Sequence, residues 1–404
     1  MINLEAPKKA GALINQAYQA AAEVFRPISR KYDSAEHTYP AELDMFAALL
    51  DGLNSSGEGG AGAAGVRRSN DKEDKKPSNR NGANLNVVLG TIEMCWGDVG
   101  LLLSMPRQGL GNAAIGSVAT DEQIKRFGKT WAAMAITEPG CGSDSAAITT
   151  TAKLDGDHYV INGEKIFVTS GQRADSVVVW ATLAKSMGKA AIKSFFVEKG
   201  TPGFEVVRVE HKLGIRASDT AVLRFENCRV PKENLLGTPD VDVNKSFAGV
   251  MQTFDNTRPL VAAMGVGVAR AALEETKRIL TEAGVTIDYD KPPNTQHAAA
   301  AAFIQLEADY ESAYLLTLES AWMADNRKPN SLQASMAKAK AGRSVVDITL
   351  RCVELAGVVG YTEETLLEKW ARDAKILDIF EGTQQIQQLI VARRILGKTS
   401  AELK

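Results

Sequence analysis

The chain has 404 residues, and its 47 basic and 49 acidic side chains leave a formal net charge of −2 at pH 7. This near balance excludes the basic surface of a nucleic-acid-binding protein, and no apolar run reaches the ~20 residues that span a membrane. Hydrophobic residues make up 45% of the chain, which is typical of a globular protein long enough for two or three domains.

Residues 1–130 are predicted to form an N-terminal helical domain with breaks at Pro27 and Pro40. Within this domain, residues 55–84 are rich in glycine and serine and then in charge, so the sequence predicts a flexible loop there. The string GAGAAG at 60–65 matches the dinucleotide-binding pattern GxGxxG. No strand precedes this string and a charged run follows it, so we expect no dinucleotide site there.

Residues 131–237 change to short alternating or β-branched runs separated by Gly, Asn-Gly and Pro, as in HYVINGEKIFVTS and SVVVWATLA. This spacing predicts an antiparallel β domain. Asn162-Gly163 stands between the apolar runs YVI and KIFVT, and this dipeptide predicts a tight hairpin turn.

Residues 238–404 return to helical periodicity, beginning at RPLVAAMG, where Pro259 suits a first helical turn. Long amphipathic segments follow one another and predict an antiparallel four-helix bundle. The order of helices, sheet and helices places the chain in the α+β class with three domains.

Cysteines and histidines are few and scattered. The cysteines have no CxxC spacing, which favours reduced thiols, and the N-terminus lacks the pattern of a secretory signal peptide. We therefore expect a cytoplasmic protein. The histidines lack ligand spacing such as HExxH, so the sequence predicts no metal site. These residues are Cys95, Cys141, Cys228, Cys352, His37, His158, His211 and His297.

One carboxylate near the C-terminus, that of Glu381, lies between the helical runs KILDIF and IQQLIVARRIL, with Gly382 after it. Among so many apolar neighbours this carboxylate would be poorly solvated, which raises its pKa toward a range useful for proton transfer at neutral pH. By spacing alone, the favoured explanation of Glu381 is a helix-terminal residue beside an N-cap, Thr383.

Three further stretches are candidates for chemistry, and each also has a purely structural explanation. TEPGCGS at 137–143 is either a loop entering the β domain or a cradle of backbone N–H groups for a ligand. FVT at 167–169 is a strand whose first and last side chains share one face. Asp255 and Arg258 lie three residues apart near a helix start, where they could form a local ion pair.

Five strings, in this order, closely resemble the acyl-CoA dehydrogenase family of flavoenzymes. They are MAITEPGCGSDS at 134–145, VINGEKIFVTSG at 160–171, KLGIRASDT at 212–220, FDNTRP at 254–259 and FEGTQQIQ at 380–387. The resemblance implies an N-terminal helical domain, a middle β domain and a C-terminal four-helix domain. It also implies bound FAD, α,β-dehydrogenation of an acyl-CoA thioester in fatty acid β-oxidation, electron transfer to an electron-transfer flavoprotein, and a tetramer.

The resemblance assigns roles residue by residue. Glu381 would remove the α-proton while hydride passes from the β-carbon to flavin N5. Some relatives carry their catalytic glutamate at the position of Thr257, so the threonine leaves Glu381 as the only matching base. Contacts to FAD fall to Met134, Ile136, Thr137, Ser143, Phe167, Val168, Thr169, Thr383 and Gln385. Contacts to the acyl-CoA fall to Ser143, Asp255, Arg258 and Gly382.

The chain departs from the family in the half of the cofactor site that a neighbouring subunit donates. An Arg-x-x-Phe-Gly stretch and a later Gln belong there, yet residues 280–303 contain no Arg and no Phe-Gly. The Gln position holds His297 or is displaced to Gln296, and an expected Gly-Gly is Gly357-Val358. We therefore expect an assembly with a related chain that supplies the missing contacts. The alternative is that other residues of this chain replace them.

Two rival functions stay open at the level of sequence. An acyl-CoA oxidase of the same fold would pass its electrons to oxygen. A non-catalytic subunit would serve only to complete a partner's site, but retention of Thr137, Thr169 and Glu381 argues against that role.

Overall fold

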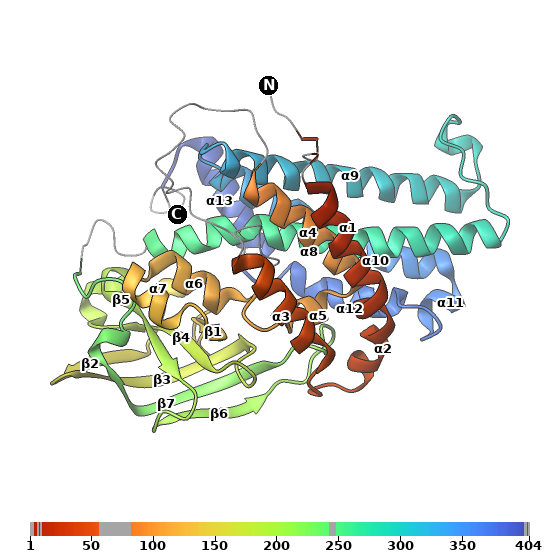
Figure 1. The fold of residues 1–404 in the computed structure, drawn as a ribbon. Helices are drawn as coiled ribbons and strands as arrows, with labels where there is room; N and C mark the ends of the chain where they lie inside the picture. The colour runs from red at the N-terminus through yellow and green to blue at the C-terminus, as the bar shows by residue number, and fades with distance from the viewer. Residues whose placement is uncertain are drawn as a thin grey trace.

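The computed structural model describes residues 4–5, 8, 10–55, 82–241, 248–399 and 402, with side chains in 49–55 and 248–256 left aside. Helices come first, a curved sheet occupies the middle and helices end the chain, so the predicted α+β class is confirmed (Figure 1). The predicted loop lies outside the described residues apart from its two ends, and the GAGAAG string lies wholly outside.

The N-terminal part is more continuous than predicted. Helix α1 (Ala10–Ala20), a π-helical turn (Ala21–Phe25) and α2 (Arg26–Ser34) form one uninterrupted helical run. The predicted break at Pro27 was wrong. Pro27 opens α2 immediately after the π-helical turn, where the wider hydrogen-bonding pattern accommodates the missing N–H. The remaining helices are α3 (Glu42–Ser55), α4 (Ala83–Gly97), α5 (Val99–Leu103), α6 (Leu110–Val118) and α7 (Asp121–Phe127).

In the described residues, seven strands form one sheet with the order β1-β4-β2-β3-β7-β6, and β5 pairs with β4. The strands are β1 (Ala132–Ala135), β2 (Thr151–Asp155), β3 (His158–Thr169), β4 (Ser176–Thr182), β5 (Ile192–Glu198), β6 (Phe204–Val209) and β7 (Thr220–Pro231). The prediction of an antiparallel sheet holds for most pairs but was wrong for two, because β4 runs parallel to both β1 and β2. Parallel neighbours need crossover connections, which hairpin signals do not reveal.

Asn162-Gly163 is not a hairpin turn. Strand β3 runs straight through both residues, and the turn before it is at Gly156, whose φ is 64°. The pairing of β3 with β7 shifts register between Ile161 and Gly163, which marks a β-bulge. A Cβ on Gly163 would lie 2.3 Å from the Thr150 hydroxyl oxygen, so glycine is required by close approach rather than by a turn.

The C-terminal helices are α8 (Ala248–Glu282), α9 (Ala298–Asp325), α10 (Ser331–Ala356), α11 (Val358–Tyr361), α12 (Leu367–Leu377) and α13 (Gln384–Leu396). Helices α8, α9 and α10 pack against one another and run side by side above the sheet (Figure 1). Pro259 was expected to open the first of them, but α8 begins at Ala248 and Pro259 lies inside it.

The largest hydrophobic core is shared by both helical parts, with Phe25 and Met94 from the N-terminal helices packing into the same cluster as Phe303 and Trp370. A second core lies within the β domain around Phe195 and the strands beside it. The N-terminal helices therefore buttress the C-terminal bundle. Within the described residues, none of the helices combines the length and the apolar character that crossing a membrane requires.

Candidate active site

The loop that carries Glu381 joins α12 to α13 in a strained turn. Glu381 has φ 53°, unusual for a residue with a side chain, and Gly382 follows at φ 92°. The buried amide of Gln387 donates to the carbonyl oxygens of both residues, each at 3.2 Å. A Cβ on Gly382 would lie 2.5 Å from the Gln387 Nε2 atom, so the tight turn excludes a side chain there. These contacts fix the direction of the Glu381 side chain.

The Glu381 carboxylate is held on the buried side of this loop. The Thr257 hydroxyl donates to its Oε2 atom at 2.5 Å. Burial raises the pKa of Glu381, and the Thr257 hydrogen bond together with the charges of Lys338 and Arg258 offsets only part of that effect. Thr257 and Arg258 are themselves buried. The pKa of Glu381 is therefore raised by burial, which is the direction that the sequence predicted for a poorly solvated carboxylate.

Lys338 is a buried cation beneath the same loop that the sequence interpretation missed. Its ammonium donates to the Gly382 carbonyl oxygen at 2.7 Å. Burial lowers the pKa of Lys338 to about 8, against the attraction of Asp378 and Glu381. The signal was present in the sequence, because helical spacing places Lys338 on the same face of α10 as the buried Ala334, Ala341 and Val345.

The predicted cofactor loop after β1 is built on a buried ion pair. The Lys165 ammonium contacts the Glu138 carboxylate at 2.8 Å and donates to the Ile136 carbonyl oxygen at 3.0 Å. Backbone N–H groups of Thr149 and Thr150 also donate to Glu138, at 2.6 and 2.9 Å. Burial by itself would raise the pKa of Glu138, but the Lys165 charge and these donors lower it to about 2.

The same loop closes on itself and lies against the end of β3. Glu138 and Cys141 exchange backbone hydrogen bonds of 3.0 and 3.1 Å, which leaves Ser143 exposed beyond the turn. The Ile166 N–H donates to the Thr137 carbonyl oxygen at 2.9 Å. The strings at 134–145 and 160–171 are therefore adjacent in space.

Phe167 presents an aromatic ring to solvent at this edge of the sheet. It has φ 57° at a second β-bulge of β3 and is 62% exposed. Val168 is buried in the β core, whereas Thr169 is half-buried. The Val168 side chain cannot meet a ligand, and only its backbone is available. Met134 and Ile136 are half-buried beside Trp180.

Residues 212–219 connect the β edge to the Glu381 loop. Asp219 accepts from the Ser170 N–H through its carbonyl and from the Gln172 N–H through its carboxylate, at 3.0 and 2.8 Å. Further along, the Ile215 N–H donates to the Asp373 carboxylate on α12 at 2.5 Å. The string KLGIRASDT thus ties the end of β3 to the helix that leads to Glu381.

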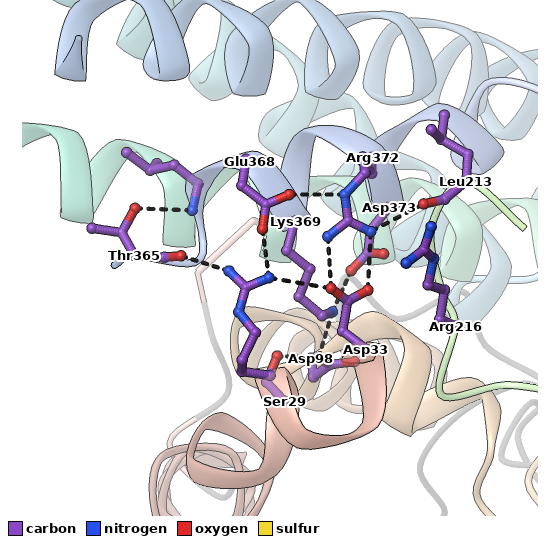
Figure 2. A network of polar contacts seen from close by, with 12 residues as sticks. Ser29, Asp33, Asp98, Leu213, Arg216, Thr365, Glu368, Lys369, Arg372 and Asp373 are labelled. Carbon is purple, nitrogen blue, oxygen red and sulfur yellow. Dashed lines mark hydrogen bonds and ion pairs between the residues drawn. The ribbon is translucent and has the colours of Figure 1, made fainter. Parts of the chain in front are cut away.

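A buried ionic network anchors that helix where the three parts of the molecule meet (Figure 2). The Lys369 ammonium lies between the Asp98 and Asp373 carboxylates, at 2.7 and 2.5 Å, and all three side chains are almost fully buried. The Ser29 hydroxyl on α2 also donates to Asp98. The Asp373 and Asp98 charges raise the pKa of Lys369 even though burial opposes them.

The rim of this network, defined by Arg372, Asp33, Glu368 and Arg30, is partly exposed. Arg372 binds the Asp33 carboxylate through two nitrogens, at 2.6 and 3.0 Å, and Glu368 at 2.8 Å (Figure 2). Arg30 adds contacts to Asp33 and Glu368. The sequence offered a partial signal, because Glu368 and Arg372 are spaced i,i+4 on one helix face.

The start of α13 combines a structural cap with side chains that suit a cofactor. Thr383 is the N-cap of α13 and its hydroxyl accepts from the Ile386 N–H at 3.4 Å, so the predicted cap is confirmed. Gln385 is exposed. The Gln384 amide oxygen is buried and has no hydrogen-bond partner among the described residues. Because an amide oxygen accepts hydrogen bonds, a bound molecule would have to donate a hydrogen bond to the Gln384 oxygen.

Comparisons with known proteins agree with this arrangement. Residues 133–228 match the acyl-CoA dehydrogenase middle domain, and residues 244–396 match the acyl-CoA dehydrogenase C-terminal domain. The chain is 35% identical to a short-chain specific acyl-CoA dehydrogenase of Clostridium acetobutylicum over 76% of this chain and 81% of that protein. It is 32% identical to the caffeyl-CoA reductase-Etf complex subunit CarC of Acetobacterium woodii, over 89% of this chain and 96% of that subunit.

Among solved structures, the butyryl-CoA dehydrogenase of Megasphaera elsdenii superposes with a TM-score of 0.81 at 27% identity. The alignment covers 98% of this chain and 100% of that chain.

Proposed function

The chain belongs to the acyl-CoA dehydrogenase family, and we propose that it dehydrogenates an acyl-CoA thioester between the α- and β-carbons with Glu381 as the base. Membership makes it an oxidoreductase acting on acyl-CoA within a family of flavoproteins. One observation carries the assignment of the base. Glu381 is a carboxylate whose pKa is raised by burial and whose direction is set by Thr257.

FAD is the cofactor that we propose for this site. The exposed Phe167 ring, the half-buried Thr137 and Thr169, and the buried amide oxygen of Gln384 offer the apolar surface and polar partners that such a ring system requires. When bound, FAD would supply the acceptor for the β-hydrogen and its electron pair. Among the predicted contacts, Met134, Ile136, Ser143, Thr383 and Gln385 lie at half-buried or exposed positions compatible with this assignment.

Glu381 would take the α-proton of the thioester. A carboxylate with a raised pKa is a stronger base than an ordinary glutamate, and the Thr257 hydroxyl engages only its Oε2 atom, so we assign the proton transfer to Oε1. The Glu381 N–H forms no hydrogen bond within the described residues, which leaves it available to a thioester oxygen. A backbone donor aimed at developing negative charge typically contributes about 3–4 kcal/mol to the transition state.

Glu381→Gln tests the proposal directly. In protein saturated with added FAD, we expect anaerobic flavin bleaching by butyryl-CoA to slow by about 10²- to 10⁴-fold, the usual contribution of a positioned base. FAD content should not change. Glu364→Gln, at an exposed position of the connection between α11 and α12, is the matched control and should bleach at the wild-type rate. Wild-type bleaching in Glu381→Gln would remove Glu381 from the mechanism.

The physiological direction and acceptor are a separate proposal. We propose oxidation with an electron-transfer flavoprotein as acceptor, whereas similarity to a caffeyl-CoA reductase subunit favours reduction of a 2-enoyl-CoA as the second candidate. Rates measured in both directions with the same thioester pair separate them. Peroxide formation in air, compared with reduction of an artificial acceptor, distinguishes the oxidase alternative. We place the reaction in the cytoplasm, where cell fractionation should find the protein.

We also propose that the chain assembles with a related subunit. Gln296 and His297, the two residues that could stand at the family's Gln position, serve local structure. The Gln296 side chain accepts from the Asp288 N–H at 3.0 Å, and the His297 ring accepts from the Ala299 N–H at 3.2 Å. Val358 is 80% exposed beside Gly357, where the family has a second glycine. Co-expression with a related chain should raise FAD content. A homotetramer with one tight FAD per subunit would contradict this.

A further inference from the structure

Two histidines and a glutamate from distant segments converge on the side of the molecule where the N-terminal helices meet the β domain. Glu36 and His37 lie in the connection between α2 and α3, and His211 lies just after β6. None of these residues has a role in the proposed reaction. The sequence predicted no metal site because no two histidines have the spacing of metal ligands. In the folded chain, His211 lies beside His37 although the two are 174 residues apart.

The three side chains meet at distances suited to a common ligand. His37 Nε2 is 3.3 Å from His211 Nδ1, which is 3.0 Å from Glu36 Oε2, and the three atoms lie within 4.8 Å of one another. Around a tetrahedral zinc ion with bonds of about 2.0–2.1 Å, ligand atoms lie about 3.3 Å apart. The two rings are tilted by 62°, and the mostly exposed His211 ring is free to adjust.

Hydrogen bonds alone do not satisfy both close contacts of the His211 Nδ1 atom. His211 Nδ1 faces both Glu36 Oε2 and His37 Nε2, but a neutral imidazole nitrogen either carries one proton or offers one lone pair. If His211 Nδ1 carries a proton and donates it to Glu36, no proton lies between Nδ1 and His37 Nε2 unless His37 supplies one, which would clash. If Nδ1 is unprotonated and accepts from His37, it presents no proton to the Glu36 carboxylate, and the two acceptors repel each other. One divalent cation coordinated by all three atoms removes the conflict.

The surrounding backbone holds the ligands in place. His37 adopts φ 70°, and the Lys212 N–H donates to the second Glu36 oxygen at 2.8 Å. The two nearby cations are turned toward carbonyl oxygens: Lys212 toward Ser218 at 2.7 Å and Arg173 toward Thr38 at 3.0 Å. The site is thus preorganised, and the exposure of His211 leaves a coordination position open to water.

We propose that Glu36, His37 and His211 form a binding site for a divalent transition metal of the zinc type that joins the α2–α3 connection to the β domain. Two imidazoles and one carboxylate are a common ligand set for such ions. The bound ion cross-links two parts of the fold. It contributes to cohesion between them and takes no part in the oxidation of substrate.

Equilibrium dialysis of untagged, chelator-treated full-length protein against zinc chloride, followed by metal analysis, tests the site. We expect one zinc per chain, with the affinity lowered at least about tenfold in His37→Gln and in His211→Gln. The chain has only four histidines, so His158→Gln and His297→Gln complete the series as matched controls. His158 is a demanding control because Asp157 lies 2.5 Å from its ring.

A second readout uses cobalt as a probe. Co²⁺ should give the intense visible absorption of a four-coordinate site in the wild type and in both controls, and not in His211→Gln. Zinc should raise the midpoint of thermal unfolding of the wild type but not of His211→Gln. Absence of stoichiometric zinc in the wild type would overturn the proposal. So would equal loss of binding in the control variants, or unchanged affinity in both His37→Gln and His211→Gln.

Discussion

Two buried lysines of the C-terminal helices, Lys369 and Lys338, have opposite electrostatic surroundings. Lys369 on α12 is paired directly with two buried carboxylates, and its pKa is raised. Lys338 on α10 donates to a carbonyl oxygen, and the charges of Asp378 and Glu381 act on it without a hydrogen bond. Burial lowers the pKa of Lys338 to about 8. Both ammonium groups are inaccessible to solvent.

The difference separates a buried cation with carboxylates in direct contact from one without them. Around Lys369 each buried charge has a partner in contact, which is the condition under which a buried ion pair is tolerated. Around Lys338 and Glu381, cation and carboxylate share a desolvated region without touching, so both pKa values are displaced toward neutral pH. Displaced pKa values of this kind concentrate at catalytic sites.

The largest expected effect is on folding, from Lys369→Met. The variant leaves Asp98 and Asp373 buried without their cation, and removing one partner from a buried ion pair typically costs about 3–5 kcal/mol. Chemical denaturation followed by circular dichroism measures the loss. Lys375→Met, which breaks a half-exposed pair with Asp378, is the control and should change stability by less than about 1 kcal/mol. If Lys369→Met lost as little stability as Lys375→Met, the contrast drawn between Lys369 and Lys338 would be wrong.

The same substitution at the other lysine should affect catalysis instead. Lys338→Met removes a poorly solvated charge, so we do not expect it to lower stability at neutral pH by more than about 1 kcal/mol. The Gly382 carbonyl loses its 2.7 Å donor and the Glu381 loop loses its anchor. Misplacement of a catalytic group by about 1 Å can slow turnover about 10²-fold, and we expect a kcat loss of about 10- to 100-fold. Unchanged kcat would show that Gln387 alone positions the loop.

Thr257→Val should have a smaller effect on rate. It removes the hydroxyl that stabilises the ionised form of Glu381, so the pKa of Glu381 rises further. Because Glu381 must be ionised to act, the acidic limb of the kcat/KM profile should move to higher pH. One hydrogen bond of about 1 kcal/mol corresponds to about a fivefold loss on that limb. An acidic limb at its wild-type position would mean that the limb does not report Glu381.

A fourth expected effect, which appears only above neutral pH, is a pH dependence of stability. The pKa of Lys338 is about 8 in the folded chain against 10.5 as its ordinary value, so between these values the unfolded chain binds more protons. The free energy of unfolding should therefore rise with pH across this window in the wild type relative to Lys338→Met. Urea midpoints of both proteins measured from pH 7.5 to 10.5 provide the difference. Parallel curves would contradict the displaced pKa.

The sequence predicted the Glu381 loop well because its signals are local. Apolar periodicity marks the helices on both sides, Thr383 caps the second, and Gly382 is required where φ is positive. Glu138 and Lys165 were missed, since nothing adjacent in the sequence shows that they become buried. Lys338 was missed although its helical spacing with apolar residues of α10 was visible in the sequence. The i,i+4 spacing of Lys369 and Asp373 hinted at a pair, but their third partner, Asp98, lies 271 residues away from Lys369.

By itself, then, the sequence determined which segments are helix or strand and where the candidate base stands between two helices. Both properties follow from side-chain period and backbone propensity over a few residues. Tertiary structure decided the parallel pairs of β4, the bulge at Gly163, the meeting of His37 with His211, and which buried lysine keeps a matching carboxylate. Those outcomes depend on which segments, distant in the sequence, pack against one another. Only that packing removes water from the side chains between them.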